Sequence, residues 1–282
     1  MSLKSLITTG LICSCLLLCS CSYQGTETDR GSSTDAADNF SVSIPKIGKA
    51  DAIVLKTENH TAIIDCGERD DGAEIIEHLK KSETEKIDYM FITHFDKDHV
   101  GGAPDIFSSF PVGEIITPDY EGNVDEYDTY ISAIKTKNLT ATALTKDLTI
   151  TLDDVTLTVY PPLKNSYAEG DNDFSLVISA THGDNSFLFA GDAEKDRLAE
   201  LSSQFDLEHT FLKMSHHGNY NKGTNAFVQS VKPKYTVITC SDKNPPKDET
   251  LSVLKGVGSE IYETRNGDIT VVSNGKTIKI LQ

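Results

Sequence analysis

The sequence predicts an α/β domain in which two mixed sheets lie face to face and helices cover their outer sides. Strand patterns occur in two batches along the chain, and helical patterns alternate with the strands of each batch. Possible metal ligands stand at the ends of at least four predicted strands: Asp65, His94–His99, Asp192 and His216–His217. Because rigid sheets present chemistry on the loops at strand ends, these residues are the candidates for a functional site.

Residues 1–20 predict a secretory signal segment. Lys4 precedes an uncharged apolar run that is too short and wrongly flanked for a stable membrane-spanning helix. The stretch Leu18–Cys21 resembles a bacterial lipobox, which implies that Cys21 becomes a lipidated N-terminus. A site at Cys15 and plain secretion are the alternatives. We therefore expect an extracytoplasmic chain that is anchored to the bacterial membrane by lipid, or secreted if Cys21 is not lipidated.

Residues 21–42 predict a flexible tether, and residues 43–282 a single folded domain. The tether is rich in Gly, Ser, Thr and Asp and nearly free of large apolar side chains, so it cannot bury enough surface to fold. The length of the remainder suits one domain. Of the six cysteines, only Cys66 and Cys240 fall in this domain, where they either pair or remain as buried thiols.

The chain is strongly acidic, with a formal net charge of −17 at pH 7. Such a surface repels polyanions and argues against broad nucleic-acid binding, unless the fold builds a local basic groove. The candidates for such a groove are Lys213, Lys222, Lys232 and Lys234, which stand near a pair of histidines in the sequence. The charge does not exclude a metal-dependent nuclease.

Each predicted element follows from local spacing of apolar residues, which distinguishes strands from helices. Predicted strands and hairpins occupy residues 50–57, 61–67, 87–94, 112–118, 140–162, 174–194, 209–218, 235–240 and 260–281. Predicted helices occupy residues 71–83, 101–110, 126–138, 195–204, 224–233 and 249–258. Asn-Gly pairs at 266–267 and 274–275 predict hairpin turns near the end of the chain.

The stretch His94–His99, with the sequence HFDKDH, follows a buried strand and precedes two glycines. A turn after Asp96 would bring Asp98 and His99 around the same point as His94. Imidazole nitrogens and carboxylate oxygens are good ligands for Zn²⁺ or Mn²⁺. The ordinary alternative is a solvated acidic turn with two incidental histidines, but it does not account for the apolar strand and the glycines on either side.

This stretch resembles the signature of the metallo-β-lactamase superfamily, His-x-His-x-Asp-His, with Asp96 in place of the second histidine. The variant is similar to the soluble hydrolase domain of the competence DNA-uptake protein ComEC and its stand-alone secreted relatives. Other segments of that family follow in the expected order: IGKADAIVL, AIIDCG, DNDFSLVI, FLFAGDAE and LKMSHHGN. The resemblance covers nearly the whole domain and implies a four-layer αββα fold at residues 43–282.

The same resemblance implies a centre of two divalent metal ions, Zn²⁺ or Mn²⁺. The metal ligands that the motifs carry over are His94, Asp96, Asp98, His99, Asp192, His216 and His217. Asp192 would bridge the ions, because a carboxylate can offer one oxygen to each. One member of the His216–His217 pair would complete the second ligand set, and the sequence leaves open which. Asp98, Asp192 and His217 are the predicted catalytic residues.

Other residues are expected beside these ligands. Asp65 would orient a metal-binding histidine, because such histidines usually need a carboxylate or carbonyl on the other ring nitrogen. Asp51 is a weaker candidate, for which we expect a structural role. Asn172 and Ser175 stand where other superfamily members often supply a third histidine to the first metal, and Asp173 is also available. The resulting oxygen-rich first site shifts the preferred ion from Zn²⁺ toward Mn²⁺.

Two further regions carry weaker predictions. ComEC-type chains often have a histidine-proline pair where this chain has Pro245-Pro246, and Lys247 is a candidate for contact with substrate. The histidines outside the motifs are expected at the surface: His60, His78, His182 and His209.

The resemblance implies a hydrolase that acts through a metal-activated water. The ComEC-type features favour cleavage of a phosphodiester, in a small phosphoester or a short nucleic acid. One alternative is a carboxylic substrate such as a lactone, thioester or β-lactam, because the same scaffold supports several chemistries. The other alternative is a non-catalytic binding lipoprotein. We expect no obligate protein partner.

Overall fold

The computed structural model describes residues 39–168 and 170–282. The predicted signal segment 1–20, the lipidation site Cys21 and most of the tether 21–42 lie outside the described residues. Within the described ranges, no helix combines the length and the apolar character that crossing a membrane requires.

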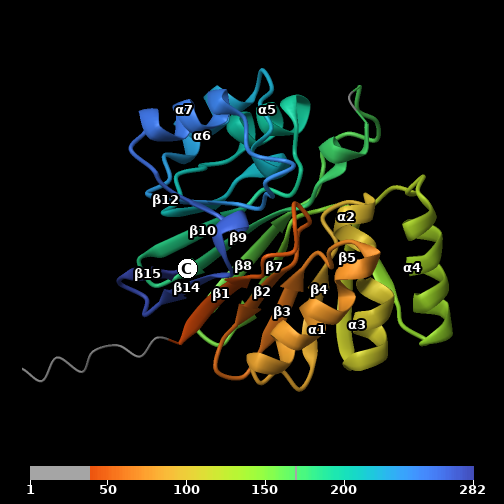
Figure 1. Ribbon diagram of the computed structural model, residues 1–282. Coiled ribbons are helices and arrows are strands. Elements are labelled where there is room, and N and C mark those ends of the chain that lie inside the picture. Colours follow the sequence, from red (N-terminus) through yellow and green to blue (C-terminus); the bar gives the residue numbers. More distant parts are fainter. Residues whose placement is uncertain (1–38, 169) are drawn as a thin grey trace, which may run out of the picture. The chain divides into compact units, whose positions relative to one another are not determined.

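The described chain forms two sheets that lie face to face (Figure 1). The first has eight strands in the order β15-β14-β1-β2-β3-β4-β5-β6. These are β15 (Ile278–Leu281), β14 (Ile269–Ser273), β1 (Phe40–Ile44), β2 (Ile53–Lys56), β3 (Thr61–Ile64), β4 (Ile87–Phe91), β5 (Val112–Pro118) and β6 (Ala141–Leu144). The second has seven strands in the order β13-β12-β11-β10-β9-β8-β7. These are β13 (Glu260–Glu263), β12 (Tyr235–Ile238), β11 (Phe211–Lys213), β10 (Asn185–Phe189), β9 (Val177–His182), β8 (Val155–Tyr160) and β7 (Leu148–Leu152).

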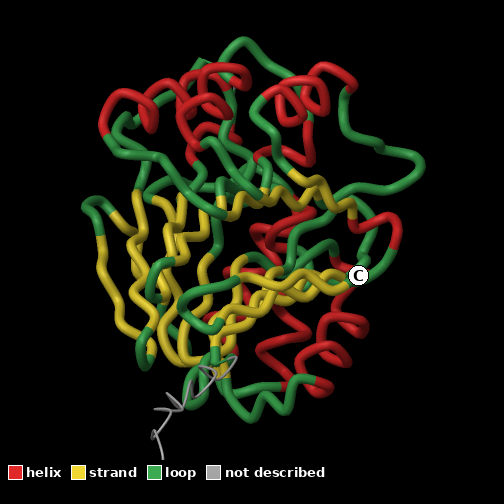
Figure 2. The backbone as a smooth tube through the Cα atoms, turned by 90° about the vertical axis from the view of Figure 1, so that its left-hand side faces the viewer, coloured by secondary structure: helices red, strands yellow, loops and turns green. Residues whose placement is uncertain are grey.

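Helices cover the outer face of each sheet, so that the strands lie between two helical layers (Figure 2). The helices on the first sheet are α1 (Gly72–Lys81), α2 (Lys97–Val100), α3 (Ala103–Ser109) and α4 (Asp125–Thr136). Those on the second sheet are α5 (Lys195–Gln204), α6 (Thr224–Val231) and α7 (Asp248–Gly256). The predicted αββα architecture is confirmed.

The core between the sheets is apolar and contains side chains from both. Phe40 of β1 packs edge-to-face on Phe187 of β10, with their ring centroids 5.1 Å apart. Both rings are buried, and burying a side chain of this size stabilises the fold by about 1.5–3 kcal/mol. This packing holds the two sheets, and therefore their loops, in a fixed relation.

The first strand begins earlier than the sequence predicted. Phe40, Ser41 and Val42 belong to β1 rather than to the tether, and β1 pairs antiparallel with both β2 and β14. The buried residues Phe40, Val42 and Ile44 alternate with partly buried serines, which is the period of a strand. The pattern spans only five residues after a long polar stretch, so it is weak in the sequence.

The end of the chain also differs from the prediction. Residues 260–281 were expected to form hairpins at both Asn-Gly pairs, but β13 pairs parallel with β12 in the second sheet. Only β14 and β15 form an antiparallel hairpin, across the turn at Asn274. An Asn-Gly pair favours a change of direction, but it does not determine which strand the following segment pairs with.

Two histidines that were expected at the surface are buried instead. His182 and His209 lie in the interior, and each has a serine partner for its ring. The hydroxyl of Ser273 lies 2.8 Å from Nδ1 of His182, and Ser179 binds Nε2 of His209. Both domain cysteines are buried free thiols in the described structure, which resolves the alternative left open by the sequence.

Parallel strands bring the candidate residues to one edge. β3 runs parallel to β4 in the first sheet, and β10, β11 and β12 run parallel in the second. The carboxyl ends of these strands carry Asp65, His94, Asp192, His216–His217 and Thr239. The fold therefore delivers the predicted ligands from both sheets to a common site.

Candidate metal centre

The His94–His99 stretch is divided between a loop and a helix. β4 ends at Phe91, and α2 begins at Lys97. The carbonyl of Asp96 accepts hydrogen bonds from the backbone of His99 and Val100, so the chain turns sharply after Asp96 as predicted. This turn places Asp98 and His99 in the first helical turn, where both are buried.

Close packing around Gly191 fixes the position of Asp192, which follows β10. Gly191 has a φ of +52°, and a Cβ atom there would lie 3.0 Å from Oγ of Ser175 and 3.1 Å from Cβ of Thr93. The hydroxyl of Ser175 accepts a hydrogen bond from the backbone of Asp192 at 3.1 Å. A glycine is therefore required at 191, and Ser175 supports Asp192 through its backbone.

Three candidate residues adopt left-handed backbone conformations. Asp65, His216 and His217 have φ values of 60°, 43° and 54°. This conformation is uncommon for residues other than glycine and costs about 1–3 kcal/mol when the surrounding structure enforces it. Such outliers gather at functional sites, and here all three belong to one cluster.

Asp192 is the hub of that cluster. Its Oδ2 atom lies 3.2 Å from Nε2 of His217, 3.3 Å from Nε2 of His99 and 3.8 Å from Nε2 of His216. Nε2 of His217 also lies 3.4 Å from Oδ2 of Asp98. One carboxylate from the second sheet thus faces histidines from both sheets.

The donor atoms at the hub suit metal ions. Within the described residues, Nε2 of His94, His99 and His217 and Oδ1 of Asp192 are buried and make no hydrogen bond. The atoms form overlapping groups within 4.8 Å, including His94 with His99 and Asp192, and Asp98 with His99 and His217. Buried polar atoms are normally paired, so this convergence fits cations held by imidazole and carboxylate groups.

Asp96 and His216 lie at the edge of the cluster. Oδ2 of Asp96 is 3.7 Å from Nε2 of His94, and the Asp96 side chain is 38 % exposed. Nδ1 of His216 lies 2.7 Å from Oε1 of Glu194, which turns its ring. Of the two neighbouring histidines, His217 rather than His216 belongs to the tight donor groups.

Asp65 orients two of the histidines. It accepts hydrogen bonds from the backbone and the hydroxyl of Thr93, each at 2.7 Å. Its Oδ2 atom also lies 2.8 Å from Nδ1 of His99, and the Thr93 hydroxyl lies 3.1 Å from Nδ1 of His94. Both rings therefore present Nε2 toward the hub, which is the arrangement predicted for Asp65.

The electrostatics of the cluster favour bound cations. Burial is the largest influence on His99 and lowers its pKa, but the carboxylates of Asp192 and Asp65 outweigh it and raise that pKa well above its ordinary value. Burial would raise the pKa of Asp98, yet His217 and His99 hold it well below its usual range. Carboxylates that hold a proton so firmly on neighbouring imidazoles also attract metal ions.

The sequence of this region matches a known family. The model of the metallo-beta-lactamase superfamily matches residues 46–241, which is more than half of the chain. The chain belongs to the metallo-β-lactamase superfamily. Members of this superfamily are generally metal-dependent hydrolases, and the donor cluster of this chain agrees with that.

Two relatives are competence-type proteins, as the sequence motifs indicated. ComE operon protein 3 of Bacillus subtilis is 24 % identical over 200 residues, covering 69 % of this chain and 26 % of that protein. Recombination protein 2 of Haemophilus influenzae is 26 % identical over 185 residues, covering 64 % of this chain and 21 % of that protein. The chain thus spans about a quarter of the length of these relatives, and the predicted resemblance is confirmed.

Solved structures show the same fold. The metallo-β-lactamase fold protein YhfI of Bacillus subtilis has a TM-score of 0.56 at 13 % identity, covering 86 % of this chain and all of that chain. The diiron β-hydroxylase CmlA of Streptomyces venezuelae has a TM-score of 0.55 at 12 % identity, covering 82 % of this chain and 54 % of that chain. At such identities the likeness concerns the fold alone.

The segment that often supplies a third histidine in this superfamily serves other purposes here. Oδ1 of Asp173 accepts backbone hydrogen bonds from Glu194 and Arg197 at the start of α5, so Asp173 caps a helix rather than facing the hub. Asn172 is partly buried, and its Oδ1 atom makes no hydrogen bond within the described chain. Oδ2 of Asp173 is also buried without a hydrogen bond, so Asn172 and Asp173 each keep one free acceptor in the described chain.

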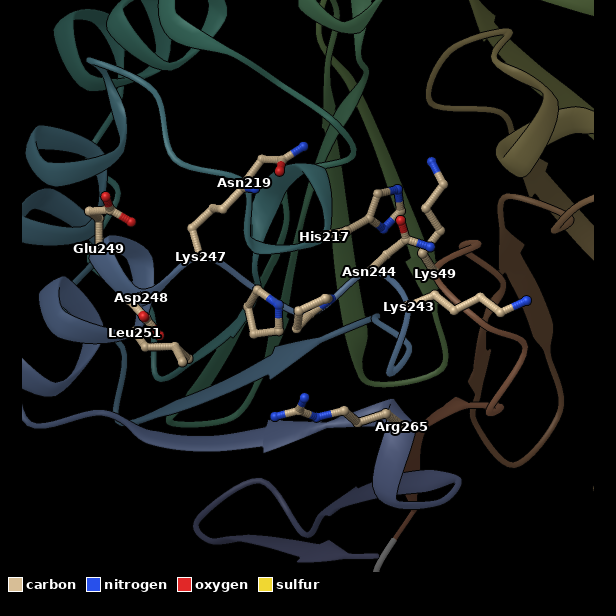
Figure 3. A pocket seen from close by; sticks show the side chains of 12 residues that line it. Lys49, His217, Asn219, Lys243, Asn244, Lys247, Asp248, Glu249, Leu251 and Arg265 are labelled. Carbon is tan, nitrogen blue, oxygen red and sulfur yellow. The ribbon is translucent and has the colours of Figure 1, made fainter.

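A cavity of about 540 Å³ opens beside His217 (Figure 3). Its cationic lining residues are Lys49, Lys243, Lys247 and Arg265. Nζ of Lys49 lies 2.7 Å from Oδ2 of Asp98, so this lysine connects the cavity with the donor cluster. Pro245-Pro246 and Lys247 line the same cavity, which brings the predicted substrate-facing lysine next to the hub.

The predicted basic groove is not formed by these four lysines. Lys213 is fully buried in an ion pair with Asp51. Lys232 and Lys234 precede β12, whereas the histidine pair follows the other end of the parallel neighbour β11. Lys222 is exposed but does not line the cavity. Positions near each other in sequence were separated because strand direction carries them to opposite edges of the sheet.

Proposed function

We propose that this chain is a metal-dependent phosphodiesterase of the metallo-β-lactamase superfamily. The observation that carries the proposal is the unsatisfied donor cluster around Asp192, which opens directly into a cavity with cationic walls. The cluster supports metal-assisted hydrolysis, and the walls support an anionic substrate. The competence-type relatives add support for a phosphodiester.

Each group in the cluster has a proposed task. The ligands of two divalent ions would be His94, Asp98, His99, Asp192 and His217, with Asp96 and His216 at the edge. When bound, such ions lower the pKa of a water and offset charge on the phosphoryl group. The few imidazoles around His94 favour Mn²⁺ there, and Zn²⁺ is the alternative. Asp98 and Asp192 are the proposed proton acceptors.

The cavity argues for a phosphoester over a neutral ester. The chain has a net charge of −17, yet Lys49, Lys243, Lys247 and Arg265 all line this one cavity. Lys49 and Arg265 pair with Asp98 and Glu263, and Asp248 and Glu249 also line the cavity. Lys243 and Lys247 are therefore the wall cations that attract an anion, while the acidic remainder of the surface repels long polyanions. A small phosphoester or the end of a short nucleic acid suits both conditions.

We also propose that the chain acts outside the cytoplasm. The lipobox-like stretch before Cys21 supports anchoring to the bacterial membrane through a lipid on that residue, with secretion as the alternative. The polar residues after Cys21 would serve as the tether. Substrate would then be a phosphoester available at the cell surface, and no obligate protein partner is required.

A second candidate function is thioester hydrolysis. Hydroxyacylglutathione hydrolase of Aliivibrio fischeri is 29 % identical over 69 residues, which is 24 % of this chain and 26 % of that protein. The match covers a short region, whereas the competence-type relatives match over most of the chain. We therefore rank phosphodiester hydrolysis first.

A panel of chromogenic substrates separates the candidates. The Mn²⁺- or Zn²⁺-loaded chain is assayed with the p-nitrophenyl ester of thymidine 5′-monophosphate, an acylglutathione thioester, a lactone and nitrocefin. We expect the highest kcat/KM for the phosphodiester, and we expect Lys243→Ala combined with Lys247→Ala to raise its KM. Turnover of only the carboxylic substrates would overturn the assignment, and metal binding without any turnover would favour a binding protein.

A further inference from the structure

A line of buried polar groups stands behind His217. Lys213 ends β11, Asp51 lies between β1 and β2, and Thr239 follows β12. Lys213 is fully buried, and Asp51 and Thr239 are each 1 % exposed. A buried lysine and aspartate are costly to desolvate and are tolerated when they pair and their other hydrogen-bonding positions are filled. In this group the hydrogen-bond donors and acceptors can be assigned in only one way.

The hydrogen-bond directions follow from the donors available. The ammonium of Lys213 can only donate, and it binds Oδ2 of Asp51. The hydroxyl of Thr239 donates to Oδ1 of Asp51 at 2.6 Å. A hydroxyl carries a single hydrogen, so the Thr239 oxygen offers only lone pairs to Nδ1 of His217, 3.0 Å away. His217 must therefore carry a hydrogen on Nδ1.

This arrangement determines what the other ring nitrogen does. In the neutral ring only one nitrogen carries hydrogen, so Nε2 of His217 presents a lone pair. That nitrogen lies 3.2 Å from Oδ2 of Asp192 and 3.4 Å from Oδ2 of Asp98. A lone pair facing two carboxylates is unfavourable unless a cation lies among them, so the ring is prepared for a metal ion.

The same device occurs a second time in the site. Thr93 donates its hydroxyl hydrogen to Asp65 and faces Nδ1 of His94 at 3.1 Å. In both places a carboxylate sets the direction of a threonine hydroxyl, and the hydroxyl sets the tautomer of a histidine. Two independent occurrences on different sheets make a chance arrangement a poor explanation.

We propose that Lys213, Asp51 and Thr239 form a relay that places the hydrogen of His217 on Nδ1 and so keeps Nε2 free to bind a metal ion. Lys213 keeps an oxygen of residue 51 toward itself, Asp51 orients the Thr239 hydroxyl, and Thr239 holds the ring. All three are positioning residues. The consequence for metal binding rests on the proposed function, whereas the tautomer does not.

The competing explanation is that Lys213 and Asp51 only fasten β11 to the segment before β2. The Asp51→Asn variant separates the two explanations at nearly constant shape. Lys213 still demands an oxygen, so the amide NH₂ of the new side chain turns to Thr239. The Thr239 hydroxyl must then donate to Nδ1 of His217, and the hydrogen of the ring moves to Nε2.

The test follows the ring nitrogens of His217 in the Zn²⁺-loaded full chain at one pH. Long-range ¹H–¹⁵N spectra of ¹⁵N-histidine-labelled protein are recorded, and His217→Gln identifies the signals. We expect a hydrogen on Nδ1 and a metal-bound Nε2 in the native chain and in Thr239→Ser, which keeps the hydroxyl. We expect Asp51→Asn to lose this pattern. The same pattern in all three proteins would overturn the relay.

Metal affinity provides the second readout. Competition with a chromophoric chelator gives the Zn²⁺ dissociation constant of each folded variant. We expect Asp51→Asn and Thr239→Val to weaken binding by about 10–100-fold, the usual range for groups that orient metal ligands, and Thr239→Ser to bind as the native chain does. Equal affinity in Thr239→Val and Thr239→Ser would contradict the relay. Neither readout requires phosphodiesterase activity, so the relay and the proposed function can fail separately.

Discussion

Asp65 shows at the residue scale how closely the site depends on single atoms. Its two oxygens accept hydrogen bonds from the backbone and the hydroxyl of Thr93 and from Nδ1 of His99. Every neighbour on this side is a donor, so only a carboxylate satisfies all of them. Through Thr93 the same group also reaches His94.

Replacing this carboxylate by an amide of the same shape tests its role. In Asp65→Asn the NH₂ group faces either the backbone N–H of Thr93 or, at the other oxygen's position, the Thr93 hydroxyl and Nδ1 of His99, so the donors that align the histidines lose an acceptor. We expect Zn²⁺ affinity to fall by about 10–100-fold in chelator competition, while the fold is kept. The exposed Asp147→Asn serves as a matched control and should bind Zn²⁺ normally. Unchanged affinity in Asp65→Asn would show that Asp65 does not orient ligands.

The sequence predicted the candidate ligands more fully than the residues that support them. His94, Asp98, His99 and Asp192 could be predicted because they stand together in motifs, and the structure brings them together. Thr239, Glu194 and Lys49 could not, because a threonine, a glutamate or a lysine at a strand or helix end has many ordinary uses. Their importance appears only when distances show which histidine or carboxylate each one touches.

At the scale of elements, the strand ends position the site, and buried polar contacts such as those of His209 connect one strand with another. His209 lies just before β11 and binds the Ser179 side chain of β9 through Nε2 and the carbonyl of Leu207 through Nδ1. Burial lowers the pKa of His209 below its ordinary value of 6.5, although the Leu207 carbonyl opposes this. The folded chain therefore holds His209 neutral where an unfolded chain would protonate it.

This predicts a pH-dependent stability with a definite sign. Because the pKa of His209 is lower in the folded state, its contribution is complete above pH 6.5 and is lost as the pH falls toward that lower value. Urea unfolding at pH 8 and pH 5.5 should show a larger loss of unfolding free energy in the native chain than in His209→Gln. Identical losses in the two proteins would contradict this assignment.

Elements with a strong local pattern were predicted, and those fixed by partners were not. The hairpin of β2 and β3 has two apolar runs around a polar turn, and it forms as expected. β1 is short and gains its stability from pairing with β14, which is more than 200 residues away. β13 joins the second sheet because β12 lies there, a choice that no local signal encodes.

On the scale of the whole molecule, positive side chains gather at one cavity although the chain as a whole is acidic. An acidic chain places four cations around one cavity, and they come from segments near Lys49, residues 243–247 and Arg265. The fold class and the edge that carries the site could be predicted from the order of strands and motifs. The cavity could not, because its walls come from distant parts of the chain that meet only after both sheets have packed.

The most direct measurement is turnover of bis(p-nitrophenyl) phosphate as metal is returned to the stripped chain. Without metal we predict no turnover, and with added Mn²⁺ or Zn²⁺ a rate that rises until about two ions per chain are bound. Asp192→Asn should lose more than about a hundredfold in rate, exceeding the effect of changing a group that merely supports a ligand. Turnover that is independent of metal, or undiminished in Asp192→Asn, would contradict a metal-centred phosphodiesterase.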